Sequence, residues 1–383
     1  MDFALDEEHQ QFRETLRAFF AKAAPLEDVA RHDREEEFNT ELYRKVADLG
    51  LCGLAFGEEY GGSDADQIAI CIAVEEVARA SAALAYAWLP TVTFCAKGIA
   101  RFGTEEQRKQ ILPRVAAGEI RMAMGLSEPE AGSDLSHLST RAERAGDDFV
   151  INGQKVFTTG ADTADYIFAF VRTDPGSVGP RGLSVLLVPR ETTGVTVRPL
   201  RKLAGQATHT CEVFLEDVRV PAENLVGELG NGSRLIADLM NGERIYVGAE
   251  GCGVGQGALD MALAYAKERE QFGKPIIEHQ AVGHMLADMA MDVQAARLVT
   301  WNAAWLLQQG RECTMEASMA KVFGSEAGTR CANRGMQILG GYSYMVEYGM
   351  ERYWRETKLY EIAGGTNQIM RNLIAKNLGR RGL

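Results

Sequence analysis

The sequence lacks the features of disulfide-rich and metal-binding proteins. It has seven cysteines, an odd number, and none of them form a Cys-X-X-Cys pair. We therefore expect small buried or half-buried thiols rather than a disulfide framework. The six histidines are scattered, and His279 and His284 are five positions apart instead of the four that place two ligands on one helical face. We expect no structural or catalytic metal.

An excess of positive charge is also missing. The net charge at pH 7 is -12, whereas nucleic-acid binding needs clustered Lys and Arg to displace counterions from the phosphates. No apolar run reaches the roughly 18–20 residues that span a bilayer. The acidic, amphipathic start lacks the basic region of a signal peptide and the Arg-rich bias of a transit peptide. We therefore expect a soluble, cytoplasmic protein that binds neither nucleic acid nor membrane.

The chain has enough hydrophobic residues for a large core, and they follow different patterns in three regions. The 383 residues, 46% of them hydrophobic, suffice for two or three domains. In residues 1–120, Phe12, Leu16 and Phe19 recur at helical spacing, and residues 68–87 have the composition of one buried helix. Thr104 is a candidate N-cap. We expect this region to be helical.

Residues 121–230 have the pattern of strands. Residues 149–157 (FVINGQKVF) place Asn152 and Gly153 between two apolar runs, which predicts a β-hairpin that turns at this dipeptide. Further β-rich runs lie at residues 166–171, 183–188, 195–197 and 211–215, separated by Pro and Gly. Their spacing predicts a small antiparallel barrel or sandwich.

Helical periodicity returns in residues 231–383, with long amphipathic stretches at residues 235–269, 279–309 and 314–339. Helices of this length pack in bundles, and we expect the core to be completed by another subunit. The glycines of residues 251–257 (GCGVGQG) superficially resemble a dinucleotide fingerprint, which requires a strand before it and a helix after it. Because they lie inside a helical pattern, we interpret them as sites of close helix approach. The order of helices, strands and helices makes the chain an α+β protein.

Four stretches resemble segments of the acyl-CoA dehydrogenase family, in that family's order and spacing. They are LSEPEAGSD at residues 126–134, VP at residues 220–221 with GELGNG at 227–232, REQFGKPI at residues 269–276 with Gln280, and QILGG at 337–341 with GTNQI at 365–369. The resemblance covers essentially the whole chain. It implies an N-terminal helical domain (1–120), a middle antiparallel β-barrel domain (121–230) and a C-terminal four-helix bundle (231–383). It also implies a homotetramer, a dimer of dimers, with FAD between β-domain and bundle and part of its site donated by a neighbouring subunit.

The resemblance implies flavin contacts on the middle domain. It makes Ser127 a hydrogen-bonding group for the flavin ring, packs Phe157 against the isoalloxazine and places Thr159 near flavin N5. Phe157 and Thr159 are two residues apart and therefore face one side of a strand. Ser133 is carried over as a contact to the cofactor and to the CoA arm of the substrate. The alternative for Ser127 is a serine bonded within its own turn. The alternative for Phe157 is an aromatic ring in the barrel core.

The remaining FAD contacts are implied to lie on the bundle. Arg269 offers a planar, charge-assisted fork to the pyrophosphate, and Gln280 adds a neutral donor. The alternative for Arg269 is a solvated arginine at a helix end. Phe272 is implied to pack on the cofactor. Gln337 and Gly341 are implied to contact the adenosine, and Thr366 and Gln368 the diphosphate and ribose.

The resemblance also indicates a catalytic base. Dehydrogenation needs a carboxylate that removes the α-proton of the thioester while the β-hydrogen leaves as hydride. Most of the family has a Glu directly before the C-terminal Gly-Thr, where this chain has Gly364. The branch that resembles isovaleryl-CoA dehydrogenase and crotonobetainyl-CoA reductase instead carries a Glu-Arg pair on a bundle helix, which matches Glu243 and Arg244. We assign Glu243 as the base, with Glu361 as its rival and a surface Glu-Arg pair as the alternative.

Further roles concern the substrate. Gly364 keeps a backbone N–H that would donate to the thioester carbonyl as charge develops there, and Arg244 would hold the local electrostatics beside the substrate. Tyr86 and Leu89 fall near the helix that floors the family's acyl pocket, and their bulk indicates a short or branched acyl chain. They are equally well explained as ordinary core residues.

Together these features predict an enzyme of fatty acid metabolism that oxidises an acyl-CoA with FAD and passes the electrons to electron-transfer flavoprotein. An enzyme of the same fold can run the reverse reaction as an enoyl-CoA reductase, and the sequence does not choose the direction. An acyl-CoA oxidase and a non-catalytic binder of flavin or CoA thioesters are also compatible with these residues.

Overall fold

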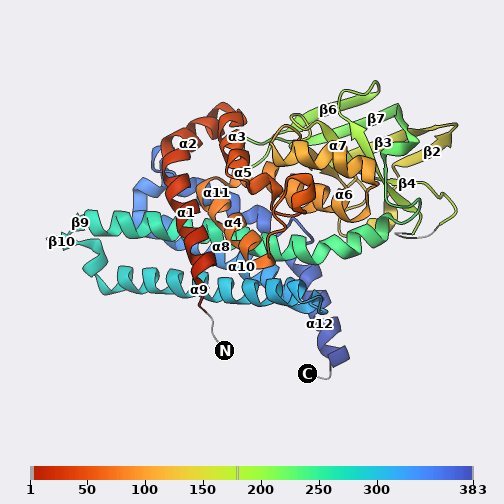
Figure 1. Cartoon of the computed structure of the whole chain (residues 1–383). Helices are drawn as coiled ribbons and strands as arrows, with labels where there is room; N and C mark the ends of the chain where they lie inside the picture. The colour runs from red at the N-terminus through yellow and green to blue at the C-terminus, as the bar shows by residue number, and fades with distance from the viewer. Residues whose placement is uncertain (1–3, 178, 180, 382–383) are drawn as a thin grey trace.

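The computed structural model describes residues 4–177, 179 and 181–381. Helices come first, a sheet follows at one end of the molecule, and long helices complete the chain (Figure 1). The helices of the first part are α1 (Glu7–Ala23), α2 (Leu26–Glu35), α3 (Thr40–Asp48), α4 (Gln67–Ala80), α5 (Ala82–Leu89), α6 (Lys97–Phe102) and α7 (Glu105–Ala116). All seven cysteines are buried, which confirms the prediction of buried thiols.

Side-chain caps mark the starts of α1, α3, α4, α5 and α7. Thr104 and Gln107 form a capping box at the start of α7, so the predicted N-cap is confirmed. The single helix predicted for residues 68–87 is wrong. Ser81 ends α4 in an extended conformation, and its hydroxyl caps α5 by accepting from the backbone N–H of Leu84. A serine inside an apolar run can start a new helix because its side chain satisfies a free N–H.

The middle part is an open sheet. Its strands are β1 (Met122–Gly125), β2 (Arg141–Ala145), β3 (Asp148–Thr159), β4 (Tyr166–Arg172), β5 (Leu183–Pro189), β6 (Val195–Leu200), β7 (Thr210–Pro221) and β8 (Leu225–Val226). The order is β6-β7-β3-β2-β4-β5-β8, and β1 pairs parallel with β4. The four predicted strand runs are confirmed within β4 to β7. The predicted middle β-domain is confirmed and most of its pairings are antiparallel, but the predicted barrel is wrong, because in the described chain the outer strands β6 and β8 do not pair with each other.

The predicted hairpin turn at Asn152 and Gly153 is also wrong. Strand β3 runs through both residues, with a register shift between Ile151 and Gly153. The turn lies earlier, at Gly146 (φ 69°) between β2 and β3. Gly153 is required for a different reason: a Cβ added there would lie 2.5 Å from the Oγ1 atom of Thr140. The glycine therefore permits close backbone approach at a bulge rather than a chain reversal.

The C-terminal part is built on three long helices. Its elements are α8 (Gly232–Glu268), β9 (Glu270–Gln271), β10 (Lys274–Pro275), α9 (Gln280–Gln308), α10 (Thr314–Leu339), α11 (Met350–Tyr360) and α12 (Asn367–Arg381). The three predicted helical stretches correspond to α8, α9 and α10, which pack on one another, while α11 and α12 pack on α10. No helix within the described ranges combines the length and apolar character needed to cross a bilayer.

The glycines of residues 251–257 lie inside α8, so the rejection of a dinucleotide fingerprint is confirmed. A Cβ added to Gly251 would lie 2.4 Å from the carbonyl oxygen of Gly324 on α10. A Cβ added to Gly253 would lie 2.2 Å from the carbonyl oxygen of Glu75 on α4. These glycines let α8 approach both neighbouring helices closely.

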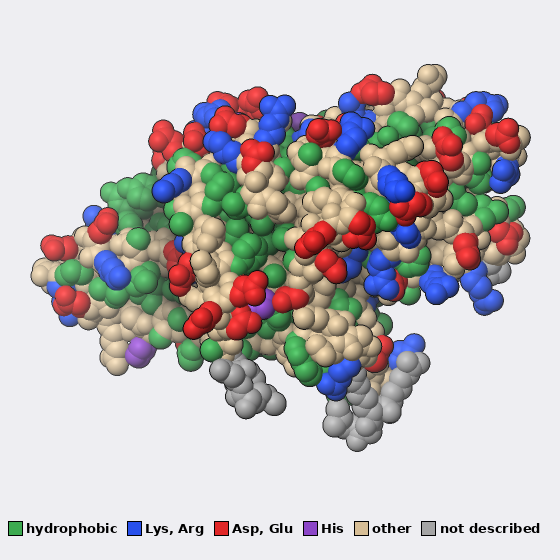
Figure 2. Space-filling view, in the orientation of Figure 1, with side chains coloured by type: hydrophobic (Ala, Val, Ile, Leu, Met, Phe, Trp, Pro, Cys, Tyr) green, Lys and Arg blue, Asp and Glu red, His purple; other side chains and the backbone are tan. Residues whose placement is uncertain are grey.

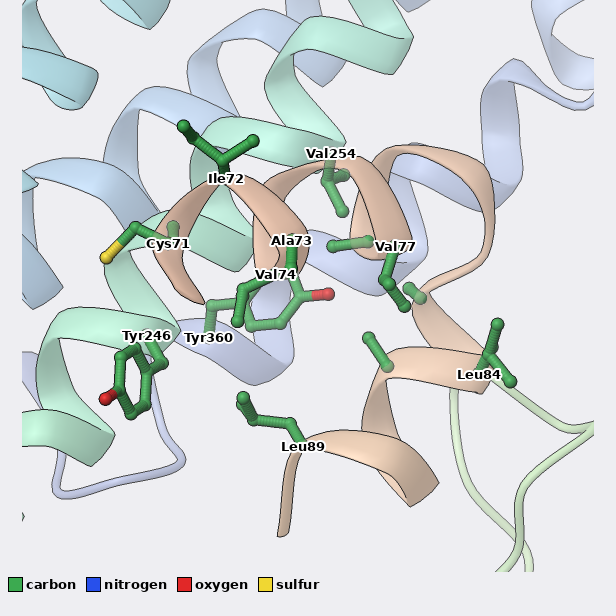
Figure 3. Close-up of a cluster of buried hydrophobic side chains, with 14 of the residues drawn as sticks. Cys71, Ile72, Ala73, Val74, Val77, Leu84, Leu89, Tyr246, Val254 and Tyr360 are labelled. Atoms are coloured by element: carbon green, nitrogen blue, oxygen red, sulfur yellow. The ribbon is translucent and has the colours of Figure 1, made fainter. Parts of the chain in front are cut away.

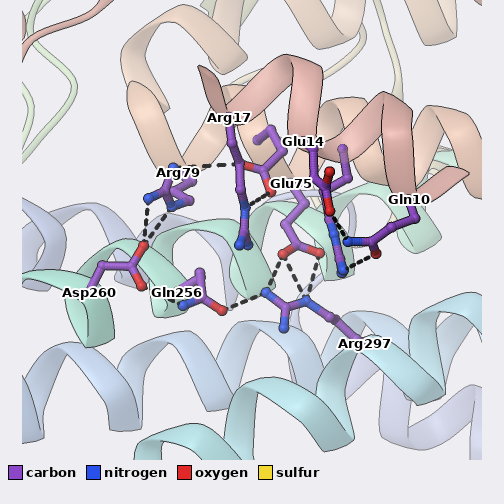
Figure 4. A network of polar contacts seen from close by, with 10 residues as sticks. Gln10, Glu14, Arg17, Glu75, Arg79, Gln256, Asp260 and Arg297 are labelled. Atoms are coloured by element: carbon purple, nitrogen blue, oxygen red, sulfur yellow. Dashed lines mark hydrogen bonds and ion pairs between the residues drawn. The ribbon is translucent and has the colours of Figure 1, made fainter. Parts of the chain in front are cut away.

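A partly buried polar network joins the N-terminal helices to the bundle (Figure 4). Arg297 on α9 donates through Nε to Glu75 on α4 at 2.8 Å and through Nη2 to Gln256 on α8 at 2.6 Å. Arg79 on α4 donates to Asp260 on α8 at 2.7 Å. Because every charge in this network has a partner, it specifies the position of α4 against the bundle without leaving an unpaired buried ion.

Candidate active site

Glu243 lies about three turns into α8. Its side chain is half-buried, and its Oε2 atom has neither solvent contact nor a hydrogen-bond partner. Burial raises its pKa to about 7. A carboxyl group that titrates near neutral pH and has no ion-pair partner among the described residues is suited to remove a proton from carbon.

Glu361, the rival for the role of base, is held in other contacts. Its Oε1 accepts from Thr329 at 2.8 Å, and its Oε2 lies 2.6 Å from the Nζ atom of Lys358. Burial alone would raise its pKa, but the hydrogen bonds from Lys358 and Thr329 outweigh burial and lower it. A carboxylate stabilised in this way is a weak base, which favours Glu243.

The loop that contains Gly364 lies against α8 close to Glu243. A Cβ placed on Gly364 would lie 3.5 Å from the Cγ2 atom of Val247, which is one turn after Glu243. Gly364 has a φ of 65°, a conformation that glycine adopts without steric cost. Buried Asn367 anchors the loop by accepting from Lys321 Nζ at 2.9 Å. The structure thus brings together the two residues proposed from the sequence as base and carbonyl donor.

Thr366 and Gln368 lie at the start of α12. The hydroxyl oxygen of Thr366 accepts from the backbone N–H of Ile369 at 3.2 Å and so caps the helix. Gln368 is exposed. A helix N-terminus of this kind presents backbone N–H groups that favour an anion such as a phosphate.

The implied flavin contacts of the middle domain lie together. The backbone N–H of Val156 donates to the carbonyl oxygen of Ser127 at 2.9 Å, which places Ser127 beside the strand that continues to Phe157. The Phe157 ring is 68% exposed, with a φ of 57° that is uncommon for a large residue. The alternative of a ring in the barrel core is therefore wrong. Thr159 is half-buried, and its hydroxyl lies 3.3 Å from that of Thr210.

A second group of implied contacts surrounds a cavity of about 710 Å³ at the far end of α8. Its lining includes Arg269, Phe272 and Gly341. The Arg269 guanidinium lies 5.7 Å from the centroid of the Tyr342 ring, and Phe272 is 94% exposed. Hydrophobic side chains are visible on the surface of this end of the molecule in Figure 2.

Four of the residues implied by the resemblance belong neither to the middle-domain flavin contacts nor to the cavity lining. Gln280 and Gln337 are exposed and do not line the cavity. Ser133 is exposed in the loop between β1 and β2. The half-buried Arg244 has one long contact, from Nη1 to Asn241 Oδ1 at 3.4 Å, and its Nε is buried without a partner.

The implied flavin contacts of the middle domain and those around the cavity lie far apart within one chain. Arg269 follows Glu243 by 26 positions along the same helical stretch, a rise of about 39 Å. Figure 1 shows α8 running from the sheet to the β9–β10 hairpin at the other end of the molecule. One chain therefore does not assemble Phe157, Glu243 and Arg269 into a single site.

Tyr86 and Leu89 are both buried in the core that joins α4, α5 and α8. The hydroxyl of Tyr86 has no hydrogen-bond partner in the described chain, and its ring lies 6.1 Å from that of Tyr360. The interpretation of Leu89 as a core residue therefore accounts for its position, whereas the unpartnered hydroxyl of Tyr86 calls for a further explanation.

Sequence reasoning missed three buried charged residues near these groups. They are Lys155 on β3, Glu250 on α8 and Lys321 on α10, each less than a tenth exposed. The signal was present, because each is a lone charge within an otherwise apolar or small-residue stretch. Charged residues are almost never fully buried without a structural or functional reason.

Three family models match consecutive parts of the chain. They describe the N-terminal domain (residues 6–119), the middle domain (123–218) and the C-terminal domain (230–379) of acyl-CoA dehydrogenases. The probable acyl-CoA dehydrogenase YngJ of Bacillus subtilis is 42% identical over 383 residues, covering 99% of this chain and 100% of that protein. The acryloyl-CoA reductase (NADH) of Anaerotignum propionicum is 36% identical over 385 residues, covering 100% and 97%. A solved structure of glutaryl-coenzyme A dehydrogenase with glutaryl-CoA has a TM-score of 0.94 at 37% identity, covering 100% of this chain and 97% of that one.

This three-domain fold, with a sheet between two helical domains, defines an oxidoreductase of the flavoprotein class. The chain belongs to the acyl-CoA dehydrogenase family. The resemblance inferred from the four sequence stretches is thus confirmed for the family, while the branch within it stays a prediction.

Proposed function

We propose that this enzyme catalyses the FAD-dependent α,β-dehydrogenation of an acyl-CoA thioester, with Glu243 as the catalytic base. The observation that carries the proposal is the Glu243 carboxyl group, which is unpartnered and has its pKa raised by burial to about 7. The Gly364 loop packs beside it. This combination supplies a base and a backbone donor on one side of a substrate, as α-proton abstraction requires.

The exposed groups described above fit a bound FAD. The uncovered ring of Phe157 offers an apolar surface for an aromatic cofactor, with Ser127 and Thr159 beside it. Arg269 and Gly341 line a cavity that suits the pyrophosphate and adenosine, with Phe272 at its edge and Gln280 and Gln337 close in sequence. Thr366 and Gln368 would meet the diphosphate at the start of α12. When bound, FAD supplies the acceptor for the substrate's β-hydride.

A homotetramer would account for the separation of the two groups of contacts. Because strand β3, which carries Phe157, and the β9–β10 hairpin next to Arg269 lie at opposite ends of the molecule, one FAD would touch the sheet of one subunit and the cavity of another. The exposed hydrophobic residues around the cavity, Phe272 and Tyr344 among them, are the surface that such an interface would cover.

The residues of the chain act on the substrate as follows. Glu243, in its carboxylate form, removes the α-proton of the thioester. The backbone N–H of Gly364 donates to the thioester oxygen, where negative charge develops as that proton leaves. Ser133 meets the CoA arm, and Arg244 sets the potential beside the base. Electron-transfer flavoprotein is the proposed acceptor of the electrons.

The reverse reaction is the second candidate function. The similarity to a relative named as an acryloyl-CoA reductase favours it, because that enzyme acts on an enoyl-CoA. The same residues serve both directions by microscopic reversibility, with Glu243 delivering the α-proton instead of removing it.

Anaerobic bleaching of the bound flavin by a panel of acyl-CoA thioesters tests the proposal. We expect at least one saturated thioester to bleach the flavin in the wild-type enzyme. Glu243→Gln should abolish bleaching while the flavin spectrum and the binding of enoyl-CoA product persist. Glu361→Gln is the matched control and should bleach normally. Bleaching at the wild-type rate by Glu243→Gln, or its loss in Glu361→Gln, would overturn the assignment.

A further inference from the structure

Polar groups without partners gather in the core beyond Glu243. Glu250 on α8 is 4% exposed and Tyr86 on α5 is 6% exposed, while Tyr360 and Glu356 on α11 are more deeply buried. The hydroxyls of both tyrosines and both carboxylate oxygens of Glu356 have no hydrogen-bond partner within the described residues. These three helices thus direct several hydrogen-bonding groups into one part of the core, with the charged side chains of Arg352 and Lys202 nearby.

The rings of Tyr86 and Tyr360 lie 6.1 Å apart, and the neighbouring carboxyl groups act on both of them. Burial, followed by the charges of Glu356 and Glu250, raises the pKa of Tyr86 well above its usual value. Burial, followed by Tyr86 and Glu250, does the same to the pKa of Tyr360. Figure 3 shows Tyr360 in a core of apolar side chains that also contains Val74 and Leu89.

Other buried carboxylates in this chain are paired. Glu75 binds Arg297 and Glu128 binds Lys155, each within hydrogen-bond distance. By contrast, Glu356 has no hydrogen-bond partner within the described residues, although the nearby charges of Arg352 and Arg355 oppose the effect of burial on its pKa. A buried polar group left unsatisfied destabilises the fold by about 1–3 kcal/mol. Native proteins retain such groups where water or a ligand supplies the missing partner.

The cluster lies in line with the proposed base. Glu250 follows Glu243 by seven positions on α8, which places the two side chains on one face of the helix, about 10 Å apart along its axis. Burial and the charge of Glu243 together raise the pKa of Glu250. An acyl chain that begins beside Glu243 and extends along α8 therefore reaches Glu250 with its distal end.

We infer that the substrate's acyl chain ends in an uncharged hydrogen-bonding group, such as a hydroxyl or an amide, which Glu250, Tyr86 and Tyr360 bind. This inference rests on the proposed function, because it takes the α-carbon to lie at Glu243. Charges of both signs lie around the cluster, Glu250 and Glu356 on one side of the balance and Arg352 and Lys202 on the other. Neither a terminal carboxylate, as in glutaryl-CoA, nor an ammonium group therefore gains a net favourable field, which favours a neutral end.

Specificity constants for thioesters matched in chain length test the inference. The probes are hexanoyl-CoA and its derivatives with a terminal hydroxyl, carboxylate or ammonium group. We expect the wild-type enzyme to favour the hydroxyl derivative over hexanoyl-CoA by roughly tenfold or more in kcat/KM, because a site built for a hydrogen bond rejects an analogue that lacks it.

Variants at position 250 separate binding from folding. Glu250→Leu should reduce the preference for the hydroxyl derivative by roughly tenfold, whereas Glu250→Gln should retain most of it. Both should fold, since replacing an unpaired buried polar group by an apolar one is often neutral or stabilising. Tyr360→Phe should weaken the preference in the same direction.

The outcomes distinguish this inference from the function on which it rests. If no thioester bleaches the flavin, the proposed function fails. If all probes bleach it with equal specificity constants, or if the carboxylate or ammonium derivative is preferred, the inference alone is overturned. A preference for the hydroxyl derivative that persists unchanged in Glu250→Leu would also reject it.

Discussion

The Nζ atom of Lys155 on β3 lies 2.6 Å from the Oε1 atom of Glu128, and both side chains are buried. Glu128 also accepts from the backbone N–H groups of Ser139 and Thr140, at 2.7 and 3.0 Å. This pair holds the segment after Ser127 against the strand that carries Phe157. Two of the proposed flavin contacts are therefore positioned by an ion pair that neither of them makes.

Removal of one partner from this pair should be costly. We expect Lys155→Met to reduce the free energy of unfolding by about 3–5 kcal/mol, because it leaves the Glu128 carboxylate buried without its counter-charge. Denaturant unfolding measures the change. The control is Arg114→Ala, which breaks the exposed pair with Glu119 and should cost less than about 1 kcal/mol. Equal losses in the two variants would contradict the structural role of Lys155.

The pH dependence of turnover should report the pKa of Glu243. Since burial raises this pKa to about 7, the carboxyl group is protonated below that pH and cannot accept the α-proton. We expect kcat/KM for dehydrogenation to rise with pH and to level off above about pH 7. Stopped-flow flavin reduction across this range provides the measurement. A profile that is flat from pH 5 to 9 would mean that another group is the base.

The raised pKa of Glu243 also predicts how the stability of the folded enzyme depends on pH. The folded enzyme holds a proton on Glu243 between its ordinary pKa of 4.5 and about 7, where the unfolded chain has lost it. Stability therefore falls as pH rises through this window. The unfolding free energy of wild type relative to Glu243→Gln should decline from pH 4.5 to 7 and then stay constant. A constant difference across that window would show that the carboxyl group is not desolvated in the folded state.

A carboxylate moved to position 364 should restore part of the lost activity. A Cβ at Gly364 would be in ordinary contact with Val247, although its φ of 65° costs a non-glycine residue about 1 kcal/mol. We expect Glu243→Gln with Gly364→Glu to recover measurable flavin reduction. The control is Glu243→Gln with Gly365→Glu, where a Cβ would lie 2.8 Å from the Cε atom of Met370 and the carboxylate would be displaced. Recovery in the control alone would place the substrate elsewhere.

Close packing between α8 and α10 should make Gly251 intolerant of a side chain. We expect Gly251→Ala to destabilise the protein by about 1–3 kcal/mol, because its Cβ would clash with the carbonyl oxygen of Gly324. Gly379→Ala on α12 is the matched control, since nothing lies within 4 Å of its added Cβ. That change should be neutral or stabilising by up to about 1 kcal/mol. The midpoint temperatures of thermal unfolding of both variants test this prediction. Similar shifts in the two variants would contradict the close approach of α8 to α10.

The long helices and most strand runs could be predicted because their periodicity is local. Two of the misread elements depended on distant contacts. Gly153 reads as a turn until Thr140 is seen to occupy the space where its Cβ would be, and closure of the sheet depends on whether β6 and β8 meet. The break at Ser81 is instead a local cap, which a serine within a continuous helical pattern does not announce.

Sequence by itself determined the family, the helical and strand regions, and Glu243 as the candidate base, since motif spacing and hydrophobic period are properties of the chain alone. Tertiary structure decided that Glu243 lacks a hydrogen-bond partner among the described residues while Glu361 has two, and that Arg269 lies a helix length away from Glu243. It also decided that the rings of Tyr86 and Tyr360, from α5 and α11, lie 6.1 Å apart. Burial and pairing arise between segments far apart in sequence, so no local pattern could have specified them.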